Sequence, residues 1–346
     1  METFKLSLPD SGIISGRYSF PSRDRKSSHV RPLIVCIPGG SYDSRYFDVD
    51  GAQSIVSLST SLNIPVIAID RPGYGASTPT ANTENASTYA QSQGRYLNST
   101  ILPAMWKAFA KRAQAPAIVL LSHSIGAMIA TIAAGSYTGA EPYPLAGIIT
   151  SGIGTQLVEG PRQGMVHLLH EATEVIHFEP APKDAIMLQL PQMNLAPIRM
   201  CRFTEQLNRP VPCGELRDIN LTWLNYWTQY SSKVKVPLLY GLGEFDGLWT
   251  CSQETMYAYK AAFPQSPNVA CEIMPMAPHC MELSFQSQAW YLKCFAFAIE
   301  CITSQSLRST MQPTGDEDKS VSPARGIITT VYTTSYGDTL LERPPL

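Results

Sequence analysis

Ser124 lies in a segment that could make a serine nucleophilic. The apolar run 117–121 precedes it, and small residues follow it, beginning with Gly126. This order predicts a buried strand, a sharp turn and a helix, with the serine hydroxyl projecting from the turn. The residues two before and two after such a serine must be small because strand and helix come close together. Gly126 meets this need, and Ser122 stands where glycine is more usual. A serine held in this way attacks acyl carbonyls.

A serine nucleophile needs a base, and the base needs a carboxylate to orient it. His279 follows the apolar run 269–274 and a short loop, so it can supply the base. Asp246 closes a glycine-rich turn after the run 236–240, where it is placed to point back over the sheet. Glu244 is the competing carboxylate, and we interpret it as a solvated loop charge. The order serine, aspartate, histidine along the chain is that of one known architecture.

Backbone N–H groups must stabilise the oxyanion that forms when the serine attacks. The N–H of Ile125 would do so from the start of the predicted helix. The second donor should come from the loop after the run 33–37, whose glycines let the backbone approach a ligand. We choose Gly40 for this N–H, with Ser41 as the alternative.

Buried strands must position these residues, and the sequence contains six continuous apolar runs. They are 33–37, 64–69, 117–121, 145–149, 236–240 and 269–274. Continuous hydrophobicity suits strands buried on both faces, and the helical patterns between the runs predict a mostly parallel sheet flanked by helices. Two further strands are expected within residues 1–20. Ligands bind beyond the carboxyl ends of such strands, where each motif above falls.

A helix is predicted where apolar residues repeat every fourth position. Leu97, Ile101, Met105 and Phe109 would share one face of it. Pro103 lies inside this stretch and predicts a kink.

Residues 157–232 interrupt the alternation of strands and helices. Seven prolines predict that its helices are short, and many methionines and aromatic residues predict an apolar surface. We interpret the segment as a helical lid between two parts of a core, 1–156 and 233–302.

Residues 303–346 form a C-terminal tail, with a flexible linker over 303–325 and a further strand within 326–336. The tail is expected to dock on the body or on a neighbouring subunit.

The composition excludes several functions. With 26 basic and 28 acidic residues the net charge is −2, and no basic run suggests nucleic-acid binding. No apolar stretch is long enough to span a membrane, and the N-terminus lacks the apolar region of a secretory signal. The eight cysteines lack metal-ligand spacing and are expected to be free thiols in a reducing compartment. We therefore expect a cytoplasmic protein with no metal and no cofactor, and leave its oligomeric state open.

Over residues 1–302 the sequence resembles the α/β-hydrolase superfamily. The resemblance rests on the loop Pro38-Gly39-Gly40, in place of the usual His-Gly, the turn Asp70-Arg71-Pro72-Gly73-Tyr74-Gly75, the turn at Ser124, and Asp246 and His279. It implies an α/β-hydrolase fold, with a central eight-stranded sheet and a cap after the sixth strand. Ser124 in place of an aspartate argues against epoxide hydrolases and haloalkane dehalogenases. More loosely, the chain is similar to soluble hydrolases of fungal secondary metabolism.

These features predict a serine hydrolase that forms an acyl-enzyme on Ser124. Its substrate would be an ester, lactone or thioester of a mid-sized hydrophobic metabolite, because the predicted lid is apolar. Contacts to that substrate are expected from Tyr42, Asp43, Arg45, His123, Trp223 and Trp227. Two alternatives remain open. A nucleophile other than water could resolve the acyl-enzyme, as in an acyltransferase or cyclase, or the protein could bind or isomerise its ligand without using Ser124.

Overall fold

A computed structural model describes residues 1–22, 30–80, 87–172 and 174–311. Within these residues a central sheet of eight strands has the order β1-β2-β4-β3-β5-β6-β9-β10. The strands are β1 (Glu2–Ser7), β2 (Ile13–Ser19), β3 (Leu33–Ile37), β4 (Val66–Asp70), β5 (Ile118–His123), β6 (Leu145–Ser151), β9 (Leu238–Phe245) and β10 (Val269–Pro278). From β4 to β10 all neighbouring pairs are parallel, and β2 is antiparallel to both β1 and β4. The predicted α/β-hydrolase fold with a mostly parallel sheet is confirmed.

Alternate residues of β3 pack into two different hydrophobic clusters. Leu33, Val35 and Ile37 belong to one cluster, and Ile34 and Cys36 belong to the other. Because successive strand side chains point to opposite faces, each cluster marks one side of the sheet. All five residues are buried, which explains why the run is continuously apolar.

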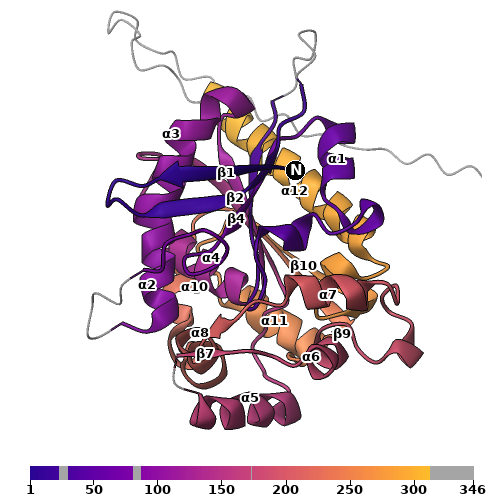
Figure 1. Cartoon of the computed structure of the whole chain (residues 1–346). Helices are drawn as coiled ribbons and strands as arrows, with labels where there is room; N and C mark the ends of the chain where they lie inside the picture. The colour runs from indigo at the N-terminus through magenta and orange to yellow at the C-terminus, as the bar shows by residue number, and fades with distance from the viewer. Residues whose placement is uncertain (23–29, 81–86, 173, 312–346) are drawn as a thin grey trace, which may run out of the picture.

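Helices cover both faces of the sheet (Figure 1). The first cluster includes residues of α2 (Tyr89–Tyr96), α3 (Leu102–Ala113), α4 (Ile125–Gly135) and α11 (Gln253–Ala261). The second includes residues of α12 (Ser287–Met311), beside which α1 (Val56–Leu62) lies. None of the described helices is long and apolar enough to cross a membrane.

The predicted kink near Pro103 takes the form of a π-helical turn. Residues Leu97–Ile101 (η3) form this turn between α2 and α3, and the N–H of Leu102 donates to the carbonyl of Leu97. Pro103 has no N–H to offer the carbonyl of Ser99, so a regular α-helical bond is missing there. The four predicted apolar positions of this stretch are all buried.

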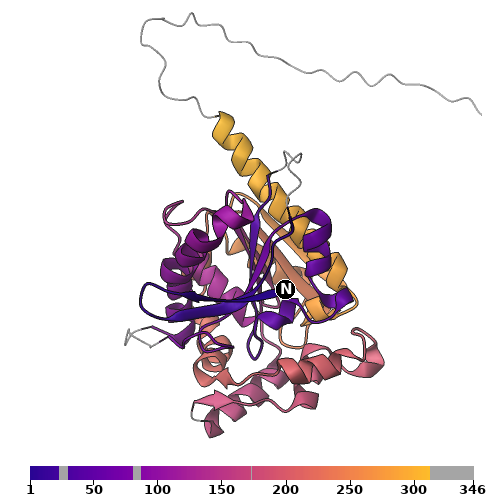
Figure 2. The same cartoon turned by 45° about the horizontal axis from the view of Figure 1, so that its top comes forward.

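Most of the segment between β6 and β9 forms a separate layer at one end of the sheet, and its last residues pack against α4 (Figures 1 and 2). It contains α5 (Glu159–Glu171), α6 (Pro180–Met187), η4 (Pro191–Met193), α7 (Met200–Leu207), α8 (Cys213–Arg217), η5 (Asp218–Thr222), α9 (Trp223–Tyr226) and α10 (Thr228–Ser231). It also contains a ribbon of two short strands, β7 (Val175–Ile176) and β8 (Val211–Pro212), which the sequence analysis did not predict. We call residues 157–232 the insertion.

The predicted linker was wrong over its first part, because α12 continues to Met311. Residues 303–311 contain neither glycine nor proline, so no residue in this stretch ends the helix. The next proline is Pro313, and helices usually end at or before the residue that precedes a proline. In Figure 2 the end of α12 projects beyond the body of the protein. The strand expected within residues 326–336 lies outside the described residues.

Candidate active site

Ser124 occupies a strained turn between β5 and α4. Its φ and ψ angles are 53° and −124°, values that a non-glycine residue rarely adopts. A Cβ at Gly126 would lie 2.3 Å from the carbonyl oxygen of Ile37, so only glycine fits there. Ser122 is tolerated in place of glycine because its hydroxyl donates to the carbonyl of Ile149 at 2.7 Å. The turn therefore has the geometry that the sequence predicted.

The structure brings Ser124, Asp246 and His279 together. The Nε2 atom of His279 lies 3.1 Å from Ser124 Oγ, and its Nδ1 atom lies 2.8 Å from Asp246 Oδ2. Asp246 is held in turn by the N–H groups of Leu248 and Trp249, which donate to Oδ1 at 2.8 and 3.0 Å. All three side chains are buried. A neutral imidazole that donates to Asp246 can accept the hydroxyl proton of Ser124.

Glu244 does not reach the histidine. It is exposed, and its Oε2 atom accepts from the N–H of Met276 at 2.9 Å. Met276 has a φ of 52° in an irregularity of β10 between Met274 and Pro278. Such bulges bend a strand and redirect the side chains that follow it. Glu244 thus supports the segment that leads into His279.

Gly40 and Ile125 face one another beside Ser124, and all three line one cavity. A Cβ at Gly40 would lie 2.7 Å from the Cδ1 atom of Ile125, which shows how closely the two segments approach. The N–H of the alternative residue, Ser41, already donates to the hydroxyl of Tyr74 at 3.3 Å. Gly40 is therefore the better candidate for the second oxyanion donor.

The cavity beside Ser124 is small and apolar, with a volume of about 40 Å³. Its described lining residues are Gly40, Ser124, Ile125, Leu157, Met165, Phe178, Met187, Leu216, Ile219, Asn220, Leu248 and Trp249. Apart from Ser124 and Asn220, their side chains are apolar. Ligand sites are commonly several hundred Å³, so in this state the insertion is closed over the serine.

None of the six predicted substrate contacts lines this cavity. Trp223 and Trp227 are buried, and Trp227 stacks on Tyr259 of α11 at 5.3 Å. The end of the insertion therefore packs on the core, because aromatic residues in short helices find their apolar contacts there. In the loop after β3, Asp43 forms an ion pair with Arg45 at 2.8 Å.

Tyr42 and His123 are also buried and do not line the cavity. The Tyr42 ring packs at 4.9 Å from that of Tyr46, and His123 stacks on Tyr46 at 5.0 Å. Burial lowers the pKa of His123 well below its ordinary value, so its ring is neutral near pH 7. These two side chains do not line the closed cavity, and their contact with substrate stays a prediction.

A buried carboxylate under the triad was missed by the sequence analysis. Glu282 accepts hydrogen bonds from Tyr46 at 2.8 Å, Ser151 at 2.7 Å and Trp290 at 3.0 Å. Burial raises its pKa, against the opposing effect of these hydrogen bonds. Ser151 also lies 3.0 Å from Nδ1 of His123, and the rings of His123 and His279 are 4.9 Å apart. Through His123, this hydrogen-bonded network packs against the ring of His279.

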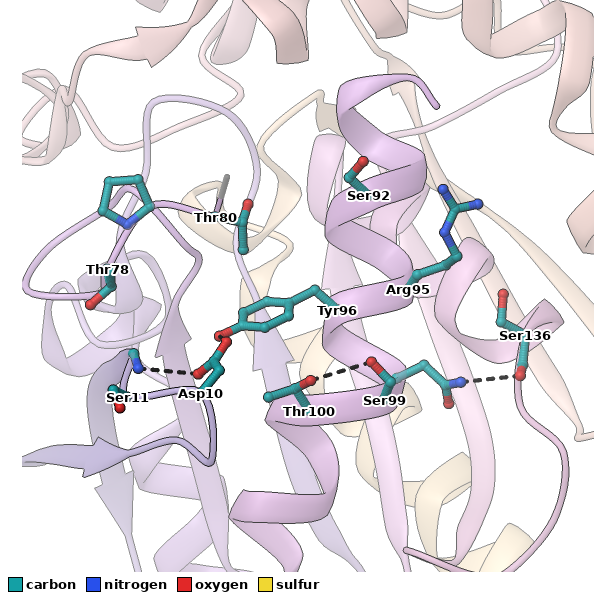
Figure 3. A pocket seen from close by; sticks show the side chains of 13 residues that line it. Asp10, Ser11, Thr78, Thr80, Ser92, Arg95, Tyr96, Ser99, Thr100 and Ser136 are labelled. Carbon is teal, nitrogen blue, oxygen red and sulfur yellow. Dashed lines mark hydrogen bonds between the residues drawn. The ribbon is translucent and has the colours of Figure 1, made fainter. Parts of the chain in front are cut away.

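A larger cleft of about 830 Å³ lies away from the triad, between the β1–β2 turn, residues 78–80 and α2 (Figure 3). Hydroxyl-bearing residues predominate in its lining, and Tyr96 donates to Asp10 across it at 2.7 Å. Among its described lining residues no nucleophile, base and acid converge, so size alone does not identify the active site.

Residues 34–289 match the profile of a family described as the alpha/beta hydrolase family. The matched segment runs from β3 into α12 and includes Ser124, Asp246 and His279. The chain belongs to the alpha/beta hydrolase family.

Solved structures similar to this alpha/beta hydrolase include two esterases and a lipase. An esterase from Thermogutta terrifontis is 16% identical, with 87% of this chain and 100% of that one covered and a TM-score of 0.54. An esterase from Exiguobacterium antarcticum is 12% identical, with 86% of this chain and 99% of that one covered and a TM-score of 0.58. Monoglyceride lipase from Saccharomyces cerevisiae is 14% identical, with 87% of this chain and 97% of that one covered and a TM-score of 0.60. Identities this low show a common fold and leave the substrate open. The sequence matches none of the curated proteins compared with it.

Proposed function

We propose that this hydrolase is a serine enzyme that cleaves an ester, lactone or thioester of a hydrophobic metabolite. The observation that carries the proposal is the hydrogen-bonded chain from Ser124 through His279 to Asp246, with the serine on a strained turn. The esterases and the lipase with the same fold support this class of reaction.

The geometry suggests how each group acts. Ser124 Oγ attacks the acyl carbonyl while His279 takes its proton, and Asp246 stabilises the imidazolium that forms. The N–H groups of Gly40 and Ile125 hold the oxyanion. His279 then gives the proton to the leaving group, and water hydrolyses the acyl-enzyme by the reverse sequence.

The apolar cavity favours a hydrophobic acyl group, and its volume indicates that the insertion acts as a lid. At about 40 Å³ the closed cavity holds a few water molecules at most. A mid-sized acyl group therefore needs the lid to open. The volume of the closed cavity does not distinguish water from a larger acceptor, so the acyltransferase or cyclase alternative is decided by the ester panel below. We place the enzyme in the cytoplasm and in secondary metabolism, where the free cysteines and the loose resemblance to fungal hydrolases point.

The test is covalent labelling with a fluorophosphonate, read by intact mass. We expect one adduct per chain, lost in Ser124→Ala. The matched control is Ser122→Gly, two residues earlier in the same turn, which should keep the adduct. Labelling that persists in Ser124→Ala would contradict the proposal, as would an unlabelled protein in which a small probe such as diisopropyl fluorophosphate also fails.

A panel of p-nitrophenyl esters of increasing chain length then separates the reactions. Release of free acid in proportion to p-nitrophenol supports hydrolysis. A burst of p-nitrophenol, followed by further release only when an alcohol or amine is added, supports acyl transfer.

A further inference from the structure

A buried ion pair joins the insertion to the core next to the candidate oxyanion loop. Arg71 follows β4, and Glu215 lies on α8; their side chains are 1% and 0% exposed. The guanidinium binds the carboxylate through two nitrogens, with Nη2 3.0 Å from Oε2 and Nη1 bonded to Oε1. Tyr74 packs its ring 4.5 Å from the guanidinium and donates its hydroxyl to Glu215 at 2.8 Å.

The same arginine holds two carbonyls of the loop after β3. Its Nε donates to the Pro38 oxygen at 2.9 Å, and its Nη2 donates to the Gly39 oxygen at 3.0 Å. The Gly39 carbonyl and the Gly40 N–H belong to one planar trans peptide, in which they point in opposite directions. Fixing the Gly39 oxygen therefore fixes the direction of the Gly40 N–H.

Glu215 is the partner that lets the guanidinium stay in this position. A buried arginine without its carboxylate would carry an uncompensated charge, which is strongly unfavourable. Leu216, the next residue of α8, lines the cavity beside Ser124. Helix α8 of the insertion thus lines the cavity through Leu216. Through Glu215 it also holds Arg71, the residue that fixes the oxyanion loop.

We propose that Glu215 is a positioning residue that couples the seating of α8 to the oxyanion hole. When α8 is seated, Glu215 holds Arg71, and Arg71 orients the Gly39–Gly40 peptide toward the cavity. When α8 lifts, Arg71 loses its partner and the Gly40 N–H loses its fixed direction. The inference rests on the proposed function, because it assigns a role within that catalytic site.

The test compares Glu215 with a second buried carboxylate of the insertion. Asp218 lies one turn further along and accepts from the N–H of Ala90 at 2.8 Å, so it also ties the insertion to the core. It touches no residue of the oxyanion loop among its described contacts. Glu215→Gln and Asp218→Asn each remove one buried charge with little change of shape.

We expect Glu215→Gln to lower kcat for a p-nitrophenyl ester about 10- to 100-fold with KM changed less than threefold, because loss of one oxyanion donor costs 100-fold or more. It should weaken a trifluoromethyl ketone, which forms a tetrahedral adduct, by a similar factor. Arg71→Lys should behave alike, since an ammonium cannot hold the carboxylate and both carbonyls. Asp218→Asn should change kcat less than threefold, whatever its effect on Tm.

The outcomes separate the two proposals. If Glu215→Gln and Arg71→Lys remain folded and keep kcat and inhibitor affinity within threefold, the positioning role is wrong while the serine mechanism stands. Equal losses of kcat in Glu215→Gln and Asp218→Asn would also overturn it, because the effect would then belong to lid anchoring in general. If the unmodified enzyme is not labelled at Ser124, the serine mechanism fails and the positioning role falls with it.

Discussion

Lys183 carries a charged group in an almost fully buried place. Its Nζ atom lies 4.0 Å from the Tyr42 ring and donates to Asn208 at 3.1 Å, and its residue is 4% exposed. Burial lowers its pKa to about 8, although the neighbouring Asp184 and Cys280 act in the opposite direction. Keeping Lys183 charged in the folded protein therefore costs desolvation free energy.

The pH dependence of stability follows from this lowered pKa. Between pH 8 and 10.5 the unfolded chain keeps a proton that folded Lys183 has lost, so the free energy of unfolding rises with pH. We expect Lys183→Met to be the more stable protein at pH 7, by roughly 3 kcal/mol at most. The advantage should shrink at pH 10. Urea denaturation at both values measures it, with the exposed Lys260→Met as control. An advantage independent of pH would contradict the prediction.

At the residue scale, the meeting of Ser124, Asp246 and His279 could be predicted because each of them follows an apolar run. The sequence favoured Asp246 over Glu244, and the structure gives each a distinct partner: His279 for Asp246 and the N–H of Met276 for Glu244. The substrate contacts were not predictable. Whether Trp227 faces a cavity or Tyr259 depends on how α10 meets α11, and no local pattern records that long-range packing. Trp249, which does line the cavity, lies only three residues after Asp246.

At the scale of elements, the bulge of β10 positions His279, the proposed catalytic base. We expect Glu244→Ala to lower kcat about threefold to tenfold, a change of roughly 0.7 to 1.4 kcal/mol in the activation free energy. This is less than a hydrogen bond to a charged group contributes, because Glu244 acts on His279 only through the backbone of β10. The binding of substrate should be unaffected, because Glu244 does not line the cavity. Steady-state kinetics measure the change, with Glu272→Ala as control, since that half-buried carboxylate of β10 pairs with Lys293 at 3.0 Å. A change in KM alone would contradict this role.

Helices and strands were predicted well where residues close together in the sequence form the pattern that indicates them. All eight strands of the sheet and the irregularity near Pro103 could be expected from apolar runs and a missing N–H. The ribbon of β7 and β8 could not, because its strands have two residues each and are separated by a long stretch of chain. The end of α12 was placed too early, since a polar helix that projects from the body shows no apolar periodicity to mark its extent.

For the whole molecule, the insertion divides into a firmly held part, which opens rarely, and a loosely held part. Buried hydrogen bonds tie α8 and η5 to the core through Glu215 and Asp218. By contrast, Met165 and Leu169 are the buried residues of α5, which is otherwise exposed or half-buried. Segments with few buried contacts open at low free energy.

Hydrogen exchange measures this division directly. We expect amides of residues 159–171 to exchange at least tenfold faster than those of 213–222 in the free enzyme. A covalent fluorophosphonate adduct with a long alkyl chain should slow exchange in α5, because the chain fills the cavity beneath it. Uniform exchange across the insertion would show that it moves as one unit.

Because Glu215 contacts Arg71, the size of an ester should limit its turnover rather than its binding. An ester too bulky for α8 to seat over it would still enter through the open lid and occupy the site. It would then face a serine without a complete oxyanion hole and dissociate unchanged. Such a compound would behave as a competitive inhibitor with good affinity, so selection among substrates would be made after binding, at the closing step.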